Sequence, residues 1–358
     1  MKTKIAQEIP EGYLKYTGRK TATIVFLALL TCVLVVLAIN AGSAELNPIQ
    51  IIMTLLGKGD ENSRVVIWNI RLPRILAAII AGASLSVAGC VMQNILRNPL
   101  ASPFTLGISQ GAAFGAALAI VVLGAGSMQS RAADAVIISN PYIVTISAFT
   151  CSMAATMVIL ALAKHVGAKP EAMVLAGVAL GSLFSAATTI IQYFAHDVQI
   201  AAIVFWTFGD LGRVTWNNVN IMFFLTITAL LYFMLHRWDY NALDSGEETA
   251  KGLGVEVDKL RLIGMTLSSL ITSVAVAFMG IIGFIGLVAP HMMRRIIGGD
   301  HRFLIPGATV MGSLLLLAAD TLARTMVKPL TLPVGAITSF MGAPLFLYLL
   351  LSREAKKR

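Results

Sequence analysis

One carboxylate, Asp320, stands inside an apolar run of the chain, in the segment LLLLAADTLART. A charge in the hydrocarbon layer of a membrane is energetically costly, so an acid at this place is a candidate for proton transport. Arg324 follows four residues later and would lie on the same helical face, where the two side chains can form an ion pair. We predict a structural Asp320–Arg324 pair near the outer helix end, with a proton-carrier role for Asp320 as the alternative.

A second polar stretch, NALDSGEETAKGLGVE from Asn241 to Glu256, separates two hydrophobic runs. Ser245 and Glu248 have the spacing of a capping box, which predicts a helix beginning there. Gly252 and Gly254 are typical helix stop signals. We therefore expect a short, rigid cytoplasmic helix between two spans, a shape suited to docking of a soluble partner. An ordinary solvated loop is the alternative.

Two further charged residues, Arg71 and Arg74 in the segment RLPR, are expected on the outer face, against the general charge trend. Long basic side chains can extend to the membrane surface from a helix end, which would make them anchors. Exposed charges also steer and orient an acidic partner, which would make them a docking surface. The residues alone leave both interpretations open.

Motifs for catalysis or nucleotide binding are missing from the sequence. The segment Gly57-Lys58-Gly59 lacks the upstream glycine and the following hydroxyl residue of a phosphate-binding loop. No H-E-x-x-H, C-x-x-C or nucleophile elbow is present, and the three cysteines are best interpreted as small packing residues. An intramembrane enzyme therefore has little support, no metal site is predicted, and energy for any transport would come from a partner or an ion gradient.

The elements that must position these residues are membrane-spanning helices. Apolar residues make up 57% of the 358 residues and charged residues 13%, and runs of about 20 apolar residues recur. This predicts an all-α polytopic membrane protein with about ten transmembrane helices. We place them near 21–40, 72–93, 103–124, 142–163, 171–194, 215–236, 259–281, 284–293, 303–323 and 334–352.

The distribution of positive charge predicts the topology. With both termini in the cytoplasm, inside segments hold 19 of the 27 lysines and arginines, which agrees with the positive-inside rule and explains the net charge of +9 without nucleic acid. We expect a cytoplasmic tail over 1–20, one transmembrane domain over 21–352 and a cytoplasmic tail over 353–358. The expected location is the cytoplasmic (inner) membrane.

Small residues and glycines predict close packing inside the bundle. Small residues recur at i+4 in three spans, which allows helix backbones to approach closely; they are Gly82, Ser86 and Cys90; Gly107, Gly111, Gly115 and Ala119; and Gly177, Gly181 and Ser185. The Gly177 face is the one most suited to line a pathway. The segment GIIGFIGLVAP from Gly280 to Pro290 is poor for a continuous helix and predicts a broken helix pair deep in the bundle.

Several segments together resemble the iron-chelate and cobalamin permease family of ABC importers, in order from about residue 65 to the C-terminus. The residues that carry the resemblance are RLPRILAAIIAGASLSVAGCVMQNILRNPLASPFTLGISQGAAFGA, LAGVALG, WTFGDLG, LDSGEETAKGLGV, GFIGLVAPHMMRR, LLLAADTLAR and LPVGAITSFMGAPLFLYLLL.

The resemblance implies a type II ABC importer permease: a ten-helix subunit that acts as a homodimer. Its partners would be two cytoplasmic ATPase subunits, which bind ATP and Mg²⁺, an external or lipid-anchored substrate-binding protein and membrane lipid. The segment 241–254 would be the coupling helix, with contact residues Leu243, Ser245, Glu247, Glu248, Lys251 and Leu253.

The same resemblance implies further site residues. Arg71, Arg74 and Arg324 match arginines that meet the binding protein. Asn98 and Leu100 fall where a cytoplasmic gate closes, with Gly177 and Gly181 along the pathway. The turn Ala168–Glu171 would form another gate layer before the fifth span, but it reads Ala-Lys-Pro-Glu and departs from the small polar residues of the cobalamin permease. No cofactor is expected in this chain.

The expected function is import of a metal chelate driven by ATP hydrolysis in separate subunits. A ferric siderophore is the expected substrate, with haem, cobalamin or an oxyanion as alternatives, because selectivity lies largely in the binding protein. The rival interpretation is a proton-coupled secondary transporter that uses Asp320.

Overall fold

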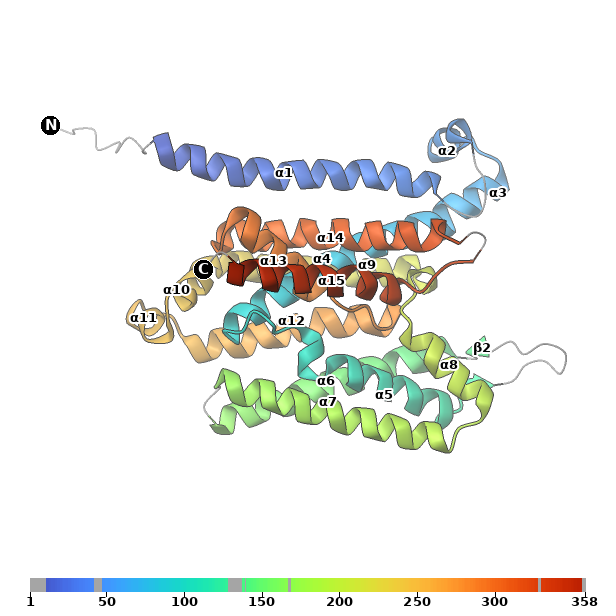
Figure 1. Cartoon of the computed structure of the whole chain (residues 1–358). Helices are drawn as coiled ribbons and strands as arrows, with labels where there is room; N and C mark the ends of the chain where they lie inside the picture. The colour runs from blue at the N-terminus through green and yellow to red at the C-terminus, as the bar shows by residue number, and fades with distance from the viewer. Residues whose placement is uncertain are drawn as a thin grey trace.

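The computed structural model describes residues 11–41, 47–127, 137–138, 140–166, 169–327 and 330–355 (Figure 1). Half of each predicted tail (residues 1–10 and 356–358) and Ala168 of the predicted gate turn lie outside these ranges. The regular elements of the described part are helices, apart from an antiparallel pair of two-residue strands, β1 (Gly126–Ser127) and β2 (Ile137–Ile138). The helix α1 already begins at Glu11, so the predicted tail over 1–20 is partly helical.

Seven helical stretches in the described part of the chain are long and apolar enough to cross a membrane. They are α1 (Glu11–Asn40), the continuous run of α3 (Glu61–Arg64), η1 (Val65–Arg71) and α4 (Leu72–Ile95), α6 (Pro141–Val166), α7 (Pro170–Tyr193), α9 (Trp216–Leu235), α12 (Val257–Met279) and α14 (His301–Thr325). Shorter elements are α2 (Pro48–Leu55), η2 (Pro103–Leu106), α5 (Ile108–Val121), α8 (Asp197–Thr207), η3 (Leu211–Arg213), α10 (Arg237–Asp244), α11 (Glu247–Gly252), α13 (Ile285–Ile297) and α15 (Val334–Ala355).

The two ends of the bundle differ in what they carry. In Figure 1, α10 and α11 lie at one end, where α1 begins and α15 ends, and α2, α3 and α8 lie at the opposite end. We call these the α11 end and the α3 end. The described ends of the chain therefore lie at the same end of the bundle, as the predicted topology requires. Which end faces the cytoplasm stays a prediction.

Helix α4 is the centre of the bundle and is buried along nearly its whole length. It packs against α14, α12, α13 and α9. Gly82 faces Gly312 of α14 so closely that a Cβ on either residue would overlap the other's carbonyl oxygen. Ser86 Oγ donates to the Ala308 carbonyl at 2.6 Å across the same contact. The predicted small-residue face of this span is thus a helix-packing contact.

The third predicted span, 103–124, is not one continuous helix. It consists of η2 and α5, separated by Gly107, whose φ of +76° is left-handed and therefore ends the first turn. Gly111 and Gly115 of α5 pack against the backbone of α6 at Cys151 and Ser147. The apolar helix α8 was not predicted, because its 11 residues are too few for a span.

The predicted broken helix pair is confirmed. Helix α12 ends at Met279, residues 280–284 are irregular, and α13 begins at Ile285. Gly280 and the non-glycine residue Phe284 both have positive φ, at +79° and +67°. Other irregular segments satisfy this backbone, because Asp210 N donates to the Met279 carbonyl at 2.7 Å. Pro290 lies inside α13 and does not end it.

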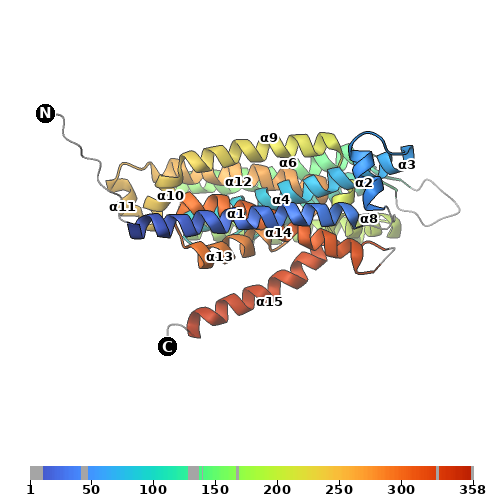
Figure 2. The same ribbon diagram turned by 90° about the horizontal axis from the view of Figure 1, so that it is seen from above.

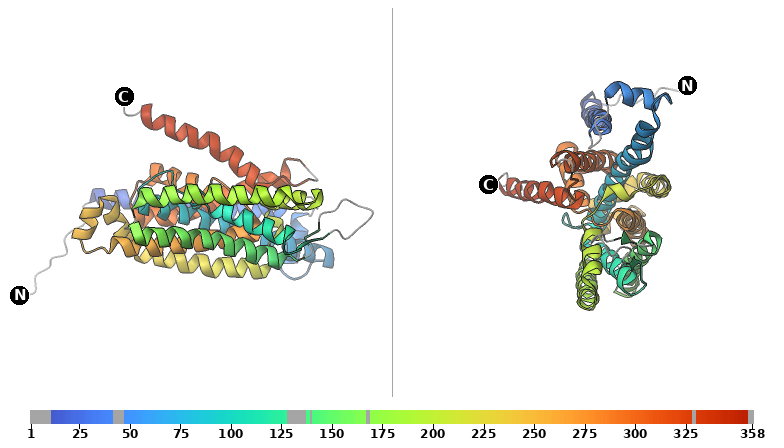
Figure 3. Two further views of the ribbon diagram at one scale, coloured as in Figure 1. Left: turned by 90° about the horizontal axis from the view of Figure 1, so that it is seen from below. Right: turned by 90° about the vertical axis from the view of Figure 1, so that its right-hand side faces the viewer.

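Three helices lie at the edge of the bundle. Much of α1 and α7 is exposed outside the bundle, including Leu175, Leu183 and Ile190 of α7. Figures 2 and 3 show α15 leaving the bundle at an angle from the end near α8. Apolar faces that the chain itself does not cover are available to lipid or to a second copy.

Candidate functional site

The polar segment at the α11 end folds as two short helices, α10 and α11, and the predicted capping box is wrong. Gly246, with φ of +121°, precedes α11, and no side chain caps that helix. Ser245 instead ends α10, and its Oγ donates to the Asn241 carbonyl at 3.4 Å. The glycine between Ser245 and the acids allows a sharp change of direction, which separates the two partners of the expected box.

Buried side chains hold this helix pair on three spans. Asn94 of α4 donates to the Tyr240 carbonyl at 3.0 Å and to Asp244 Oδ1 at 2.6 Å. Arg261 of α12, which is 1% exposed, donates to the Ile95 carbonyl at 3.1 Å and to Glu247 Oε2 at 2.6 Å.

Asn241 makes the third attachment, because its side chain both donates a hydrogen bond to the N-terminus of α14 and accepts one from it. Its Nδ2 donates to Asp300 Oδ1 at 3.0 Å, and its Oδ1 accepts from His301 N at 2.8 Å. Bonds to α4, α12 and α14 leave α10 and α11 little freedom to move independently of the spans.

The six predicted coupling residues divide into two groups. Leu243 is fully buried, and Glu247 is engaged by Arg261 and by Lys251, whose Nζ lies 3.0 Å from Glu247 Oε1. These contacts hold the pKa of the Glu247 carboxyl at about 2, with the Arg261 hydrogen bond as the largest cause. The residues that remain exposed are Ser245, Glu248, Lys251 and Leu253, and they form the surface that we call the α11 tip.

Three charged residues that were predicted on the outer face, Arg74, Asp320 and Arg324, form a buried triad near the α3 end. Asp320 is fully buried, and each of its carboxylate oxygens meets an arginine: Arg74 Nε at 2.8 Å and Arg324 Nε at 2.9 Å. The predicted Asp320–Arg324 pair is confirmed. The bond to Arg74 was not predicted, because 246 residues separate the two partners.

Arg324 and Arg71 also bind the carbonyl end of α1. Arg324 Nη1 donates to the Ala41 carbonyl at 2.7 Å, and Arg71 Nη1 donates to the Ile39 carbonyl at 2.5 Å. The last carbonyls of a helix lack intrahelical partners and carry partial negative charge, so a guanidinium stabilises them. All three predicted docking arginines are less than 10% exposed. Docking through them stays a prediction, and their observed contacts are within the chain.

Two charged residues close to this triad were missed by reasoning from local spacing. Asp210 Oδ1 lies 3.8 Å from Arg74 Nη2, and its Oδ2 lies 3.9 Å from Arg213 Nε. Arg213 Nη2 donates to the Phe205 carbonyl at 2.7 Å. The sequence does place an acid and an arginine three residues apart, beside glycines, just after α8, and this spacing could have indicated the pair. The same pattern also fits an ordinary turn.

The predicted gate and pathway residues lie in different surroundings. Leu100 is exposed near the α11 end, and Asn98 Oδ1 accepts from Leu100 N at 2.9 Å, which fixes the turn after α4. Gly177 and Gly181 are buried. Gly177 packs against the backbone of Leu106, which explains its lack of a side chain. The gate and pathway roles stay predictions.

Among the described residues, no group of three or more His, Cys, Asp and Glu side chains is placed to hold a metal ion. The contacts described above are ion pairs and hydrogen bonds, and they position helices.

Comparison with known proteins identifies the family. The profile of the FecCD transport family matches residues 29–352. An ABC transporter permease protein of Methanocaldococcus jannaschii is 56% identical over 344 residues, covering 96% of this chain and 98% of that protein. The hemin transport system permease of Yersinia pestis is 38% identical over 92% of this chain and 96% of its own length.

A solved structure agrees with the sequence comparison. It is an inward-facing transporter assigned to the metal-chelate type, similar to this chain with a TM-score of 0.80 and 29% identity, over 92% of this chain and 98% of that one. Fold and sequence match along nearly the whole chain. This protein belongs to the FecCD transport family and is the permease subunit of an ABC transporter, not an enzyme.

Proposed function

We propose that this chain forms the membrane pathway of an importer for a metal chelate, with a ferric siderophore as the first candidate. Relatives named for hemin, Fe(3+)-citrate and cobalamin transport support the chelate class. Haem, cobalamin and oxyanions remain as alternative substrates. An external binding protein would deliver the substrate, and two separate ATPase subunits would bind ATP and Mg²⁺.

The α11 tip carries this proposal. Glu248 and Leu253 are exposed, with the Glu248 side chain 94% accessible, on a helix pair that is bonded to α4, α12 and α14. A soluble subunit that binds this tip would move the three spans with it, since these bonds transmit displacement. ATP can drive transport only if the ATPase subunits bind one arrangement of the spans better than another.

A homodimer completes the pathway in this proposal. The exposed apolar residues of α7 and the divergent helix α15 give the chain surfaces that a second copy would cover. Gly177 and Gly181 lie on α7, and Leu100 is exposed, so we assign the gate roles proposed for these residues to the dimer.

A proton-coupled transporter is a weaker alternative. Both oxygens of Asp320 are engaged by arginines, so a proton carrier would have to release two guanidinium groups in each cycle. This alternative predicts uptake that collapses with an uncoupler at constant ATP, whereas our proposal predicts uptake that follows ATP.

We also propose that the binding protein docks through Arg71, Arg74 and Arg324, which requires a change in their present contacts. Their guanidinium groups would have to leave contacts with Asp320 and α1, or approach the partner from a small exposed fraction. A reversal of Arg71 and Arg74 to glutamate would therefore impair folding as well as docking, and a binding measurement needs a folding control.

The test uses the complex purified gently from its own membranes. Native mass spectrometry should give two copies of this chain with two ATPase subunits, and a retained ligand mass would identify the substrate. Glu248→Arg should lower transport-coupled ATPase activity by at least about ten-fold, through loss of favourable contact energy. Glu256→Arg, whose side chain is 76% exposed, is the matched control. Equal effects of the two variants, or a chain without ATPase partners, would reject the proposal.

A further inference from the structure

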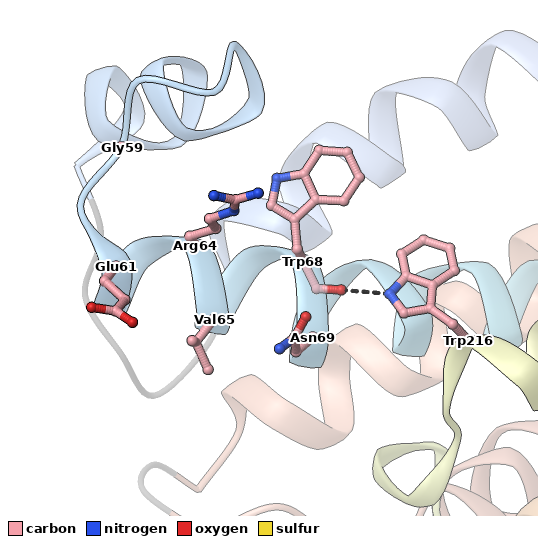
Figure 4. A pocket seen from close by; sticks show the side chains of 7 residues that line it. All are labelled: Gly59, Glu61, Arg64, Val65, Trp68, Asn69 and Trp216. Atoms are coloured by element: carbon pink, nitrogen blue, oxygen red, sulfur yellow. Dashed lines mark hydrogen bonds between the residues drawn. The ribbon is translucent and has the colours of Figure 1, made fainter.

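A cavity of about 730 Å³ lies at the α3 end, and its wall shares no residue with the Asp320 triad or the α11 tip. Figure 4 shows it between α3, η1 and the first turn of α9. Its wall includes Glu61, Arg64, Trp68, Asn69 and Trp216. Two indoles, one guanidinium and one carboxylate form a mixed polar and aromatic wall, which neither the coupling nor the transport proposal uses.

The cavity wall follows from a break in helical hydrogen bonding. η1 is a π-helix, in which each carbonyl accepts from the N–H five residues later, as Leu72 N donates to the Ile67 carbonyl. The next carbonyl, that of Trp68, would need the N–H of residue 73, which is Pro73 and has none. Trp216 Nε1 donates to this carbonyl at 2.8 Å instead. This bond fixes the start of α9 against η1 and holds one indole in the wall.

The charged groups of the cavity are available to a ligand. The side chains of Glu61 and Arg64 are exposed, and neither forms a hydrogen bond or ion pair with any other residue that the structure describes. In Figure 4 the Arg64 guanidinium and the Trp68 indole extend to the same side of the helix, and the Glu61 carboxylate, about a turn away, extends to the other side in this view. A guanidinium binds phosphate oxygens bidentately, and a carboxylate binds an ammonium group.

The position of the cavity matches the membrane surface. Trp216 is the first residue of the spanning helix α9, and tryptophan concentrates where spans meet the headgroup layer. Phe223 and Ile227 follow seven and eleven residues later on the same helical face, and both are exposed. An apolar stripe therefore continues from the cavity into the hydrocarbon region.

We propose that this cavity binds the headgroup of a membrane phospholipid, with an acyl chain lying along α9. Arg64 binds the phosphate, Glu61 faces a headgroup ammonium, and the two indoles lie at the level of the ester groups. The proposal is independent of the transported substrate.

The test measures phospholipid retained by the full-length protein after reconstitution with phosphatidylethanolamine, detergent extraction and native mass spectrometry. Arg64→Gln should reduce retention by roughly ten-fold, and Arg64→Lys should restore part of it, because the charge remains. Lys58→Gln removes an exposed charge at the same end but outside the cavity wall, and should change nothing. Thermal unfolding of each variant checks that it is folded.

Three outcomes separate the lipid from other occupants. Glu61→Gln should reduce the preference for phosphatidylethanolamine over phosphatidylglycerol, which lacks the ammonium group. Millimolar inorganic phosphate should not displace the lipid, and displacement as effective as that by a short-chain phospholipid would identify a free-anion site and overturn the proposal. Equal retention by the Arg64→Gln and Lys58→Gln proteins, both folded, would also overturn it.

Discussion

Replacement of Asp320 by asparagine tests whether the buried triad holds the bundle together. The variant keeps the size of the side chain but leaves Arg74 and Arg324 buried without their shared counter-charge. Removal of one partner of a buried ion pair costs roughly 3–5 kcal/mol. Arg324 keeps its bond to the Ala41 carbonyl, so we expect the lower part of that range, about 3 kcal/mol of unfolding free energy.

The matched control is Asp210→Asn. Asp210 contacts arginines at 3.8 and 3.9 Å, and its side chain is 43% exposed, so its removal should cost less than about 1 kcal/mol. Both variants are compared by unfolding in mixed micelles of increasing SDS content. If Asp320→Asn does not accumulate, Arg74→Gln, which leaves the Arg324 contact in place, gives a smaller and measurable loss. A loss for Asp320→Asn no greater than that for Asp210→Asn would refute the structural role of the triad.

Two further predictions concern the backbone contact and the α11 anchor. Gly312→Ala places a methyl group against the Gly82 carbonyl and should lower the unfolding free energy by about 1–3 kcal/mol. Gly299→Ala serves as the control, because a Cβ at that position meets nothing within 4 Å. Equal stability of the two proteins would contradict the close packing. The Glu247 carboxyl has its pKa lowered from 4.5 to about 2, so it stabilises the fold above pH 4.5, and this contribution is lost as the pH falls from 4.5 towards 2. Glu247→Gln should remove that part of the pH dependence in urea titrations, and an unchanged profile would show that the Arg261 contact does not stabilise the fold.

The fold was predictable where its causes are local in sequence. The broken segment before α13 was predicted because glycine spacing and proline act through the backbone of their own neighbourhood. The Asp320–Arg324 pair was predicted because four residues on a helix bring two side chains together. Seven of the ten predicted spans, those that are long helices in the described part of the chain, followed from length and hydropathy.

The rest depends on contacts between distant segments. Nothing near Arg74 in the sequence indicates that its partner is Asp320 on another span. The predicted capping box between Ser245 and Glu248 is wrong because the chain turns at Gly246, between these two residues. The local sequence fits both a capped helix and a turn, and contacts with the surrounding spans decide between them. The sequence contains one indication of the bond between Trp216 and Trp68, which is Pro73. Pro73 leaves the Trp68 carbonyl without a helical partner only if the helix has π hydrogen bonding, and that is visible only in the structure.

The contact between Gly82 and Gly312 limits where this protein can move. Two backbones that touch without intervening side chains cannot slide or rotate without losing hydrogen bonds or colliding, so α4 and α14 behave as a single mechanical unit. Movement in a transport cycle therefore displaces this unit as a whole, relative to elements at the edge such as α15 and α7. The unit keeps its shape while it moves relative to its periphery, so a substitution that loosens it would uncouple the two ends of the protein before it changes what passes through.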